Sequence, residues 1–471
     1  MVERLNGFRW MATTLVLLVG VSCVVGTGWG ADAGSQGSLD IVMEALRSGD
    51  PDMVAVAIGL VRDISGQEAT KALAAELPNL PPMGQVQLIS ALADRGDRLA
   101  LPAIMELTKS SNADVRIAAY KAMGQLGDAS GVMPLAEAAA GATGAEQKAA
   151  AESLSRLRGE GVDEAILAGI GTAEPDVKVA LIAAVGQRNI VSGVSTLMAA
   201  AQEPETKVQR EAFRVLKVIA GQGDVAGLVQ LLMGVKTGSV RSEAERTVAV
   251  VAKRIEDPNS QVSAILAVLP EVDGDLNRAS LLNVLGKIGS NRGLDVLKKA
   301  ISDESESIRE TAIRALSEWP TGEPATELLK AAVISDNPTH KVLALRGYIH
   351  LLGLAKDLPA SWKVALYELG MELSPNVQEK KRVLSGLGSA GSVEALAAIE
   401  RYLDDGQVRT EAQAAAVRIA SAIGGDHPDK ARAVLRKIAA TAELEIVRNQ
   451  AQTALDVIDG KRPEVIPETL Q

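Results

Sequence analysis

RLALPAIMELTKSSNADVRIAAYKAMGQLGD, residues 98–128, contains one complete copy of the unit from which this chain is built. Its first part, 98–108, is mostly apolar and has Pro102 near its start. A helix tolerates proline in its first turn, because the N–H groups there have no intrahelical partner. Polar residues at 110–112 interrupt the apolar run. The first part therefore predicts one short helix.

The second part of the same unit predicts another helix. Apolar residues follow Val115 at spacings of 3, 4, 7 and 8, which is one stripe of an amphipathic helix. The carboxylate of Asp114 is expected beside the helix N-terminus, where the helix dipole favours negative charge. Gly124 and Gly127 are expected to end the helix. The same ending recurs at Val185-Gly186, Leu285-Gly286-Lys287-Ile288-Gly289, Leu387-Gly388 and Ile423-Gly424-Gly425-Asp426.

This unit recurs along nearly the whole chain with a period of about 31 residues. Nine of the twelve gaps between successive marker residues are within one residue of 31. The markers are Met53, Gly84, Val115, Gln147, Val177, Val208, Val240, Leu276, Ile308, His340, Val377, Val408 and Val447. Four residues after a marker, alanine stands at positions 57, 119, 151, 212, 244, 312, 344, 412 and 451.

A period of this size predicts a solenoid, in which each hairpin buries its apolar face only against its neighbours. Hydrophobic residues make up 47% of the 471 positions and aromatic residues only 2%, so small apolar side chains dominate. The fold class expected is all-α, a right-handed α-solenoid (alpha-alpha superhelix) of about 13 helical hairpins over 34–460. The three longest gaps predict insertions or longer helices near 255–275, 355–375 and 425–440, and 461–471 is expected to be a tail.

The first 33 residues resemble a signal peptide. Arg4 and Arg9 precede an apolar stretch at 11–25, and small residues follow, so that cleavage after Gly30 or Ala33 fits. Export to a bacterial periplasm or to the outside of the cell is therefore expected, with no stable membrane span left after cleavage. Retention of the segment as a membrane anchor is the alternative, although its apolar stretch is shorter than the roughly 20 residues of a usual span.

Cys23, the only cysteine, lies inside this segment, so a mature chain would contain none and would need no disulfide. Lipidation of Cys23 is a further alternative. Its signal is weak, because Gly20 stands where such motifs have leucine. The sequence does not decide between cleavage, lipidation and retention.

The start of the second helix carries a resemblance to a known family. Asp114-Val115-Arg116, Asp176-Val177-Lys178 and Ser239-Val240-Arg241 resemble the Asp-Val-Arg opening of the second helix in HEAT repeats. Ser307-Ile308-Arg309, Gln407-Val408-Arg409 and Ile446-Val447-Arg448 follow the same pattern. The period is similar to that of the short HEAT-like repeats also found in phycobilin lyases. The resemblance implies a scaffold fold and does not by itself specify an activity.

Arginines on the second helices are interpreted in two ways. Arg116, Arg241, Arg309, Arg409 and Arg448 directly follow a marker and are expected to form a structural ladder to acidic groups of adjacent repeats. A second set lies further along the helices and is the candidate for docking an acidic segment of a partner protein: Arg210, Arg214, Arg246 and Arg314. The alternative for this set is a solvated face balanced by Glu211, Glu243 and Glu245.

Other candidate chemistry is sparse. His340 and His350 are ten residues apart, a spacing that does not place two ligands on one face of a helix, and His427 lies far along the chain. No metal site, cofactor site or catalytic constellation is recognised in the sequence. The formal charge of −10 and the few aromatic residues argue against general nucleic-acid binding. Trp319 and Trp362 are expected to fill gaps between repeats.

These observations favour an exported, non-catalytic scaffold that binds a protein partner along an inner surface of second helices. A lyase-like or enzyme accessory protein that holds a small ligand in the concavity is the main alternative. A spacer element without a ligand is a third. The sequence identifies neither the partner nor the oligomeric state.

Overall fold

The computed structural model describes residues 31–236, 238–355 and 357–461, with side chains from residue 37 onward. Over these residues the chain forms twenty-six α-helices and seven short 3-10 helices, with no strand, which confirms the all-α prediction. The helices pair into thirteen consecutive hairpins, each made of a first and a second helix. Every marker from Met53 to Val447 lies in the first turn of a second helix or directly before it. The predicted repeat register is therefore confirmed.

The chain divides into two compact units, which are described separately here: unit 1 ends at Ala220 and unit 2 begins at Gly221. The first helices of unit 1 are α2 (Ala31–Arg47), α4 (Gln67–Ala75), α6 (Leu101–Glu106), α8 (Val132–Gly141), α10 (Val162–Thr172) and α12 (Val194–Ala200). Its second helices are α3 (Pro51–Val61), α5 (Pro82–Arg95), α7 (Ala113–Leu126), α9 (Gly144–Arg156), α11 (Pro175–Arg188) and α13 (Thr206–Ile219).

Unit 2 repeats the same organisation over seven hairpins. Its first helices are α14 (Val225–Gly234), α16 (Ser263–Val268), α18 (Asn291–Ala300), α20 (Ala325–Ile334), α22 (Ala360–Leu373), α24 (Val393–Glu400) and α26 (Pro428–Thr441). Its second helices are α15 (Gly238–Ala252), α17 (Asp275–Ile288), α19 (Glu306–Ser317), α21 (Pro338–Leu354), α23 (Val377–Leu387), α25 (Arg409–Ile423) and α27 (Glu445–Ile458).

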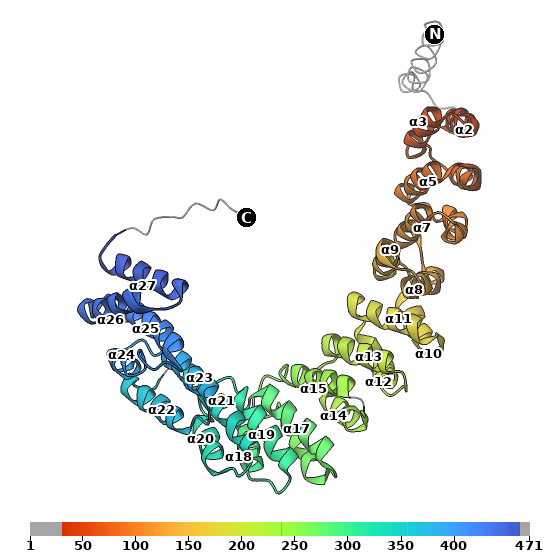
Figure 1. Cartoon of the computed structure of the whole chain (residues 1–471). Helices are drawn as coiled ribbons and strands as arrows, with labels where there is room; N and C mark the ends of the chain where they lie inside the picture. The colour runs from red at the N-terminus through yellow and green to blue at the C-terminus, as the bar shows by residue number, and fades with distance from the viewer. Residues whose placement is uncertain (1–30, 237, 356, 462–471) are drawn as a thin grey trace. The chain divides into compact units, whose positions relative to one another are not determined.

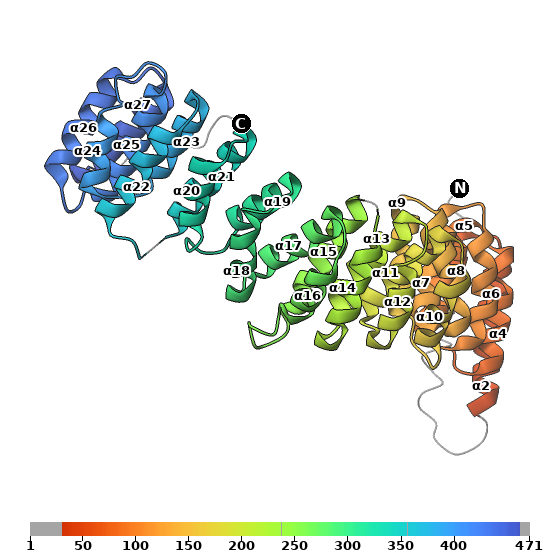
Figure 2. The same ribbon diagram turned by 90° about the horizontal axis from the view of Figure 1, so that it is seen from below.

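Hairpins stack in sequence order within each unit. Figures 1 and 2 show the first helices on one side of each stack and the second helices on the other. Helices that pack closely belong to the same hairpin or to two consecutive ones. The alanines four residues after the markers explain the close packing, since those at 119, 212, 244, 312, 344, 412 and 451 are completely buried. A side chain of this size lets neighbouring helices approach. Each hairpin thus obtains its core from its neighbours.

The polar residues between the two helices of a hairpin act as helix caps. In the unit at 98–128, the side chain of Asn112 accepts hydrogen bonds from the backbone N–H groups of Asp114 and Val115, at 2.9 and 3.3 Å. Asp114 itself lies in the first turn, where its charge remains favourable. The short first helix expected at 98–108 is a 3-10 turn, helix α6 and a second 3-10 turn.

Several glycines have a different role from the one the sequence suggested. Gly124, Gly186 and Gly286 lie inside α7, α11 and α17 and do not end them. A Cβ atom on Gly124 would lie 2.9 Å from the Cβ of Ser153, and one on Gly286 would lie 2.8 Å from the Cβ of Ala315. These glycines therefore mark places where the next second helix approaches closely. Gly127, Gly289, Gly388 and Gly424 do stand at helix ends, as expected.

At the three long gaps the structure has one loop and several long helices. Residues 253–262 form turns and bends between α15 and α16, while α21 has 17 residues and both α22 and α26 have 14. Residues 1–30 of the expected signal peptide and 462–471 of the expected tail lie outside the described residues. Among the described helices, none combines the length and the apolar character needed to span a bilayer.

Candidate functional site: the second-helix surface

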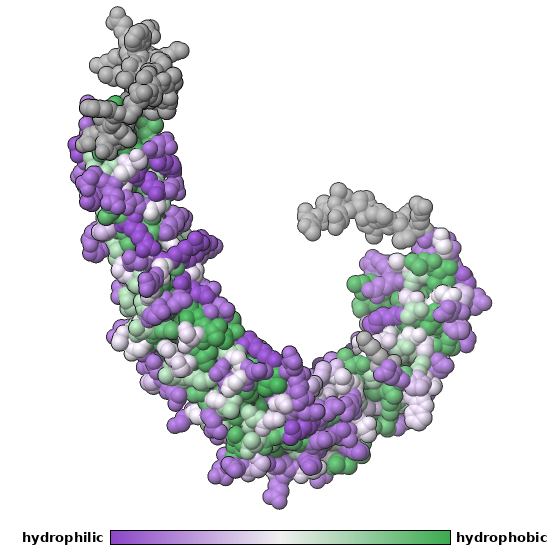
Figure 3. Space-filling model, turned by 180° about the vertical axis from the view of Figure 1, so that it is seen from behind, coloured by the Kyte–Doolittle hydropathy of each residue, from purple (hydrophilic) through white to green (hydrophobic). Residues whose placement is uncertain are grey.

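The second helices expose a surface on which charged and apolar side chains alternate. Figure 3 shows hydrophilic and hydrophobic residues interleaved over one face of both units, without a single apolar area that covers either unit. The charged groups on the second helices therefore distinguish one part of this surface from another.

The predicted ladder of arginines is confirmed at two positions. Arg116 on α7 donates to the Glu146 carboxylate of the next second helix, from Nε at 2.6 Å and from Nη2 at 2.7 Å. The bond from Arg116 is the largest cause that lowers the pKa of Glu146. Arg409 on α25 reaches Glu443, in the loop between α26 and α27, at 2.7 Å. Both arginines tie one hairpin to the next.

At the other three positions the ladder prediction is wrong in its choice of partner. Arg309 donates to the carbonyl oxygens five and six residues earlier, at 2.9 and 2.8 Å, and Arg448 does the same at 2.9 and 2.7 Å. Arg241 is buried and binds the Val235 carbonyl together with Ser280 and Asn277 of α17. Arg116 donates to the equivalent carbonyl oxygens of Ser110 and Ser111 as well, so these contacts do not depend on the ladder, and an acid of the next hairpin is an additional partner.

The four arginines proposed to dock a partner do not form one cluster. Arg210 and Arg214 lie one turn apart on α13 in unit 1, whereas Arg246 is on α15 and Arg314 on α19 in unit 2. Arg210 is exposed and makes no hydrogen bond or ion pair with the described residues. Arg214 pairs with Glu211, three residues earlier on the same helix, with its Nε at 2.7 Å.

The two arginines in unit 2 have the same local arrangement. Arg246 lies 3.0 Å from Glu243, and Arg314 donates to Glu310 from Nε at 2.9 Å and from Nη2 at 2.7 Å. In these pairs the arginine is the more exposed partner, at 60% against 13% for Arg246 and Glu243. The structure thus supports part of the alternative reading, a face balanced by Glu211 and Glu243. Glu245 differs, since it faces Lys287 of α17 at 3.5 Å.

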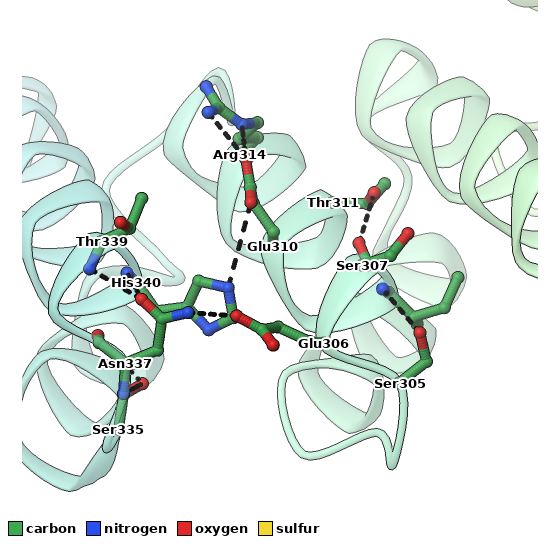
Figure 4. A network of polar contacts seen from close by, with 11 residues as sticks. Ser305, Glu306, Ser307, Glu310, Thr311, Arg314, Ser335, Asn337, Thr339 and His340 are labelled. Carbon is green, nitrogen blue, oxygen red and sulfur yellow. Dashed lines mark hydrogen bonds and ion pairs between the residues drawn. The ribbon is translucent and has the colours of Figure 1, made fainter.

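The pair on α19 continues into a network with α21, which Figure 4 shows. Asn337 caps α21 by accepting from the N–H groups of Thr339 and His340 at 2.7 and 3.3 Å, and its amide donates to Glu306 of α19. His340 is buried, and its Nε2 atom lies 4.0 Å from the Glu310 oxygen on the side away from Arg314. That Nε2 atom has no hydrogen-bond partner. His340 therefore occupies a core position that most other repeats fill with an aliphatic marker.

The other two histidines, His350 and His427, lie apart from this network; His350 is exposed on α21 and His427 directly precedes α26. Within the described ranges, no three histidine, cysteine, aspartate or glutamate side chains come close enough together to hold a metal ion.

A second charged cluster lies on α21 and α23 and was not predicted from the sequence. Arg346 on α21 donates to the Glu379 carboxylate of α23 from Nε at 3.1 Å to each oxygen and from Nη2 at 2.6 Å. Arg382, one turn beyond Glu379, is 3.6 Å from the same carboxylate. The Glu379 bond raises the pKa of Arg346. The sequence contains one sign of this cluster: Glu379 stands three residues after Asn376. The side chain of Asn376 caps α23 by accepting a hydrogen bond from the backbone N–H of Glu379.

The two tryptophans differ in their environment. Trp319 is buried at the end of α19, which confirms its packing role. Trp362 in the first turn of α22 is 67% exposed, so the packing prediction is wrong there. A hollow of about 770 Å³ is lined by residues of α20, α21 and α22 that include Leu329, Leu352 and Leu366. At its wall, the Tyr348 hydroxyl donates to the Leu366 carbonyl at 2.8 Å, and burial raises the pKa of Tyr348.

Comparison with known proteins finds similar repeats in part of the chain. A family model for HEAT repeats matches residues 70–155 and 262–344. The uncharacterized phycocyanin operon protein Z of Pseudanabaena tenuis is 27% identical over 159 residues, which cover 26% of this chain and 78% of that protein.

The fold is similar to solved karyopherin structures. Kap121p bound to the extreme C-terminus of the protein phosphatase Cdc14p aligns with a TM-score of 0.55 at 12% identity, over 90% of this chain and 54% of Kap121p. Yeast importin-beta (Kap95p) aligns with a TM-score of 0.50 at 14% identity, over 94% of this chain and 68% of that protein. The chain thus spans about half the length of Kap121p, and at this identity the likeness shows the fold alone. The matched repeats and the stacked hairpins show that the chain contains HEAT repeats, arranged as consecutive helical hairpins.

Proposed function

We propose that this chain is an exported, non-catalytic scaffold that binds another protein along the surface of its second helices. The observation that carries the proposal is the layering of charge on that surface. In the pairs Arg214–Glu211, Arg246–Glu243 and Arg314–Glu310 the arginine is the more exposed partner. A partner that approaches the surface meets guanidinium groups before it meets carboxylates.

This layering favours a partner with an acidic segment. Arg314 binds Glu310 through Nε and Nη2, and its Nη1 group can still donate to a second carboxylate. Charges of this kind contribute to orientation and association rate more than to affinity. Solved Kap121p structures contain a bound protein segment, such as the extreme C-terminus of Cdc14p, so a solenoid of this kind is suited to hold a peptide.

The proposal of export rests on the N-terminal sequence. Arg4 and Arg9, the apolar stretch 11–25 and the small residues after it have the order of a signal peptide, and residues 34–471 contain no cysteine. Fractionation of a bacterial host that expresses the full chain tests it. A shortened chain in the periplasm is expected, whereas a full-length chain in the cytoplasm would contradict export.

The scaffold proposal is tested by capture of partners from an exported fraction, with residues 34–471 as bait and cross-link mapping of the captured protein. Charge reversal to glutamate at Arg210, Arg214 and Arg246 together is expected to abolish capture. The matched control reverses three cations on the first-helix side, Lys71, Lys109 and Lys330, each also paired with a glutamate three residues earlier. Capture that survives the first change, or fails equally after the second, contradicts the second-helix surface as the binding face.

A second candidate function, holding a small apolar ligand, has one observation in its favour: the hollow of about 770 Å³ between α20, α21 and α22. Five of the fourteen residues that line it are leucines, and Tyr348 is a buried residue among the others. Binding of the apolar probe anilinonaphthalene sulfonate, lost in Leu329→Trp, would support a ligand site there. Equal probe binding by the variant would count against it.

A further inference from the structure

The carboxylate of Glu379 is the most deeply buried acid on the second helices of unit 2. Its side chain is 1% exposed, while its two partners, Arg346 and Arg382, are 43% and 50% exposed. A buried carboxylate costs several kcal/mol unless it is paired and hydrogen-bonded. Here three hydrogen-bond contacts from Arg346 and the nearby Arg382 satisfy it. Glu379 is therefore a fixed anchor that holds two guanidinium groups at the surface.

Positive charge exceeds negative charge around this anchor. The helices α21 and α23 together carry five cations, Lys341, Arg346, Lys380, Lys381 and Arg382, and Glu379 is their only acid. The formal charge of these two neighbouring helices is thus +4, in a chain whose net charge is −10. By contrast, α15 and α19 each carry two arginines and two glutamates.

Donor groups of this cluster remain available. Arg346 uses Nε and Nη2 on Glu379, and neither its Nη1 group nor the Nη groups of Arg382 make a hydrogen bond to the described residues. Arg382 and Lys381 point their charges from the half of α23 opposite the buried Val383, Leu384 and Leu387. The planar guanidinium group matches a carboxylate with two parallel hydrogen bonds.

We propose that the α21–α23 cluster, defined as Arg346, Glu379, Lys381 and Arg382, is the anchoring point for an acidic segment of a partner protein. The inference rests on the proposed scaffold function and places its strongest contact at residues outside the four arginines first considered. A carboxylate of the partner binds the free edge of Arg382, and an acid next to it in the partner segment faces Lys381 or Arg346.

The chemistry of the rest of the chain favours a protein segment over a nucleic acid. A net charge of −10 repels an extended polyanion beyond the cluster, and only 2% of residues are aromatic, too few for base stacking. A short acidic peptide meets only the local excess of cations.

The experiment uses the mature chain, residues 34–471, and a fluorescein-labelled ten-residue peptide of alternating glutamate and glycine. The same peptide with glutamine in place of glutamate is the neutral probe. Lys381→Gln with Arg382→Gln removes two charges at the surface and leaves Arg346 on the buried Glu379, so the fold is retained. The matched control is Lys71→Gln with Lys330→Gln, two similarly exposed cations on the first helices α4 and α20, outside the proposed binding surface.

The wild type is expected to bind the glutamate peptide in low salt and to bind the neutral peptide at least 10-fold more weakly. The α23 double variant is expected to lose about 10-fold or more in affinity, because it removes two cations that can form charge-assisted hydrogen bonds with the peptide. The control double variant should retain wild-type affinity. Equal loss in both variants, or no preference of the wild type for the charged peptide, overturns the cluster as the anchor.

Two further readouts separate this inference from the scaffold proposal. If the α23 double variant still captures the natural partner from the exported fraction, the anchor is overturned and the scaffold stands. If the wild type captures nothing from that fraction, the scaffold proposal fails, whatever the peptide does. Sedimentation velocity gives the oligomeric state of the wild type and of the α23 double variant. A wild-type dimer that is lost in the variant would show that a second copy of this chain occupies the cluster, and this also overturns the assignment to a partner protein.

Discussion

Gly286 on α17 offers the sharpest test of how the second helices stack. A Cβ atom at this position would lie 2.8 Å from the Cβ of Ala315 on α19, 3.2 Å from its Cα and 3.3 Å from its carbonyl oxygen. None of these atoms belongs to a flexible side chain, so Gly286→Ala must push the two helices apart. Overpacking of this kind costs about 1–3 kcal/mol.

The same substitution also has a favourable term. Alanine in a helix interior is more stable than glycine by about 1 kcal/mol. Gly59 measures that term alone, because it stands third from the end of α3 as Gly286 does in α17, and nothing lies within 4 Å of its added Cβ. Gly59→Ala is therefore expected to raise the free energy of unfolding by about 0.5–1 kcal/mol. Gly286→Ala is expected to lower it by about 0–2 kcal/mol.

Urea unfolding followed by circular dichroism gives the global comparison. Hydrogen exchange of the α17 and α19 amides gives the local one, which matters because repeat proteins depart from two-state unfolding. Gly286→Ala should speed exchange in those two helices and leave α3 unchanged. If Gly286→Ala stabilises as much as Gly59→Ala, with no faster exchange in α17 and α19, the close approach of these helices is refuted.

Three further predictions concern buried polar groups. Arg241→Met should lower the free energy of unfolding by about 2–3 kcal/mol, because it leaves the Val235 carbonyl without its donor; Arg246→Met, on the same helix but exposed, should change it by less than about 0.5 kcal/mol in the same urea titration. The hydrogen bond from Arg47 is the largest cause that lowers the pKa of Glu76. This pair therefore stabilises the fold at pH values above the usual glutamate pKa, and the stabilisation is lost as the pH falls through the lowered pKa. Thermal melts should therefore show Glu76→Gln less stable than wild type near pH 7, with the difference closing toward pH 3, and a difference that persists at pH 3 would contradict the reasoning. His340→Val should raise stability by about 1 kcal/mol, since it removes a buried Nε2 atom that has no partner; a lower melting temperature would show that the histidine is bound in the core.

The repeat register follows from the sequence because it depends on local periodicity and recurs thirteen times. The roles of individual polar residues depend on what the next hairpin brings. Arg116 has an acid, Glu146, 30 residues further on, whereas Thr339 stands 30 residues after Arg309. Comparing each arginine with the residue 30 positions later would have shown that Arg116 has an acid on the next hairpin and Arg309 does not.

Local sequence patterns do not predict the packing between hairpins. Gly124 resembles a helix terminator when its own neighbours are considered, and only the approach of Ser153 from the next repeat explains it. The anchor at Glu379 was missed for the same reason, since its partner Arg346 is 33 residues earlier in the chain. In both cases the deciding contact joins two different repeats.

Because helices pack closely only within a hairpin or with the next one, each unit should respond to mechanical force in small steps. Pulling on its ends would peel off one hairpin at a time, and each event would release about 31 residues, on the order of 100 Å of extended chain. A protein built in this way yields gradually under load, and the hairpins that remain attached keep their shape.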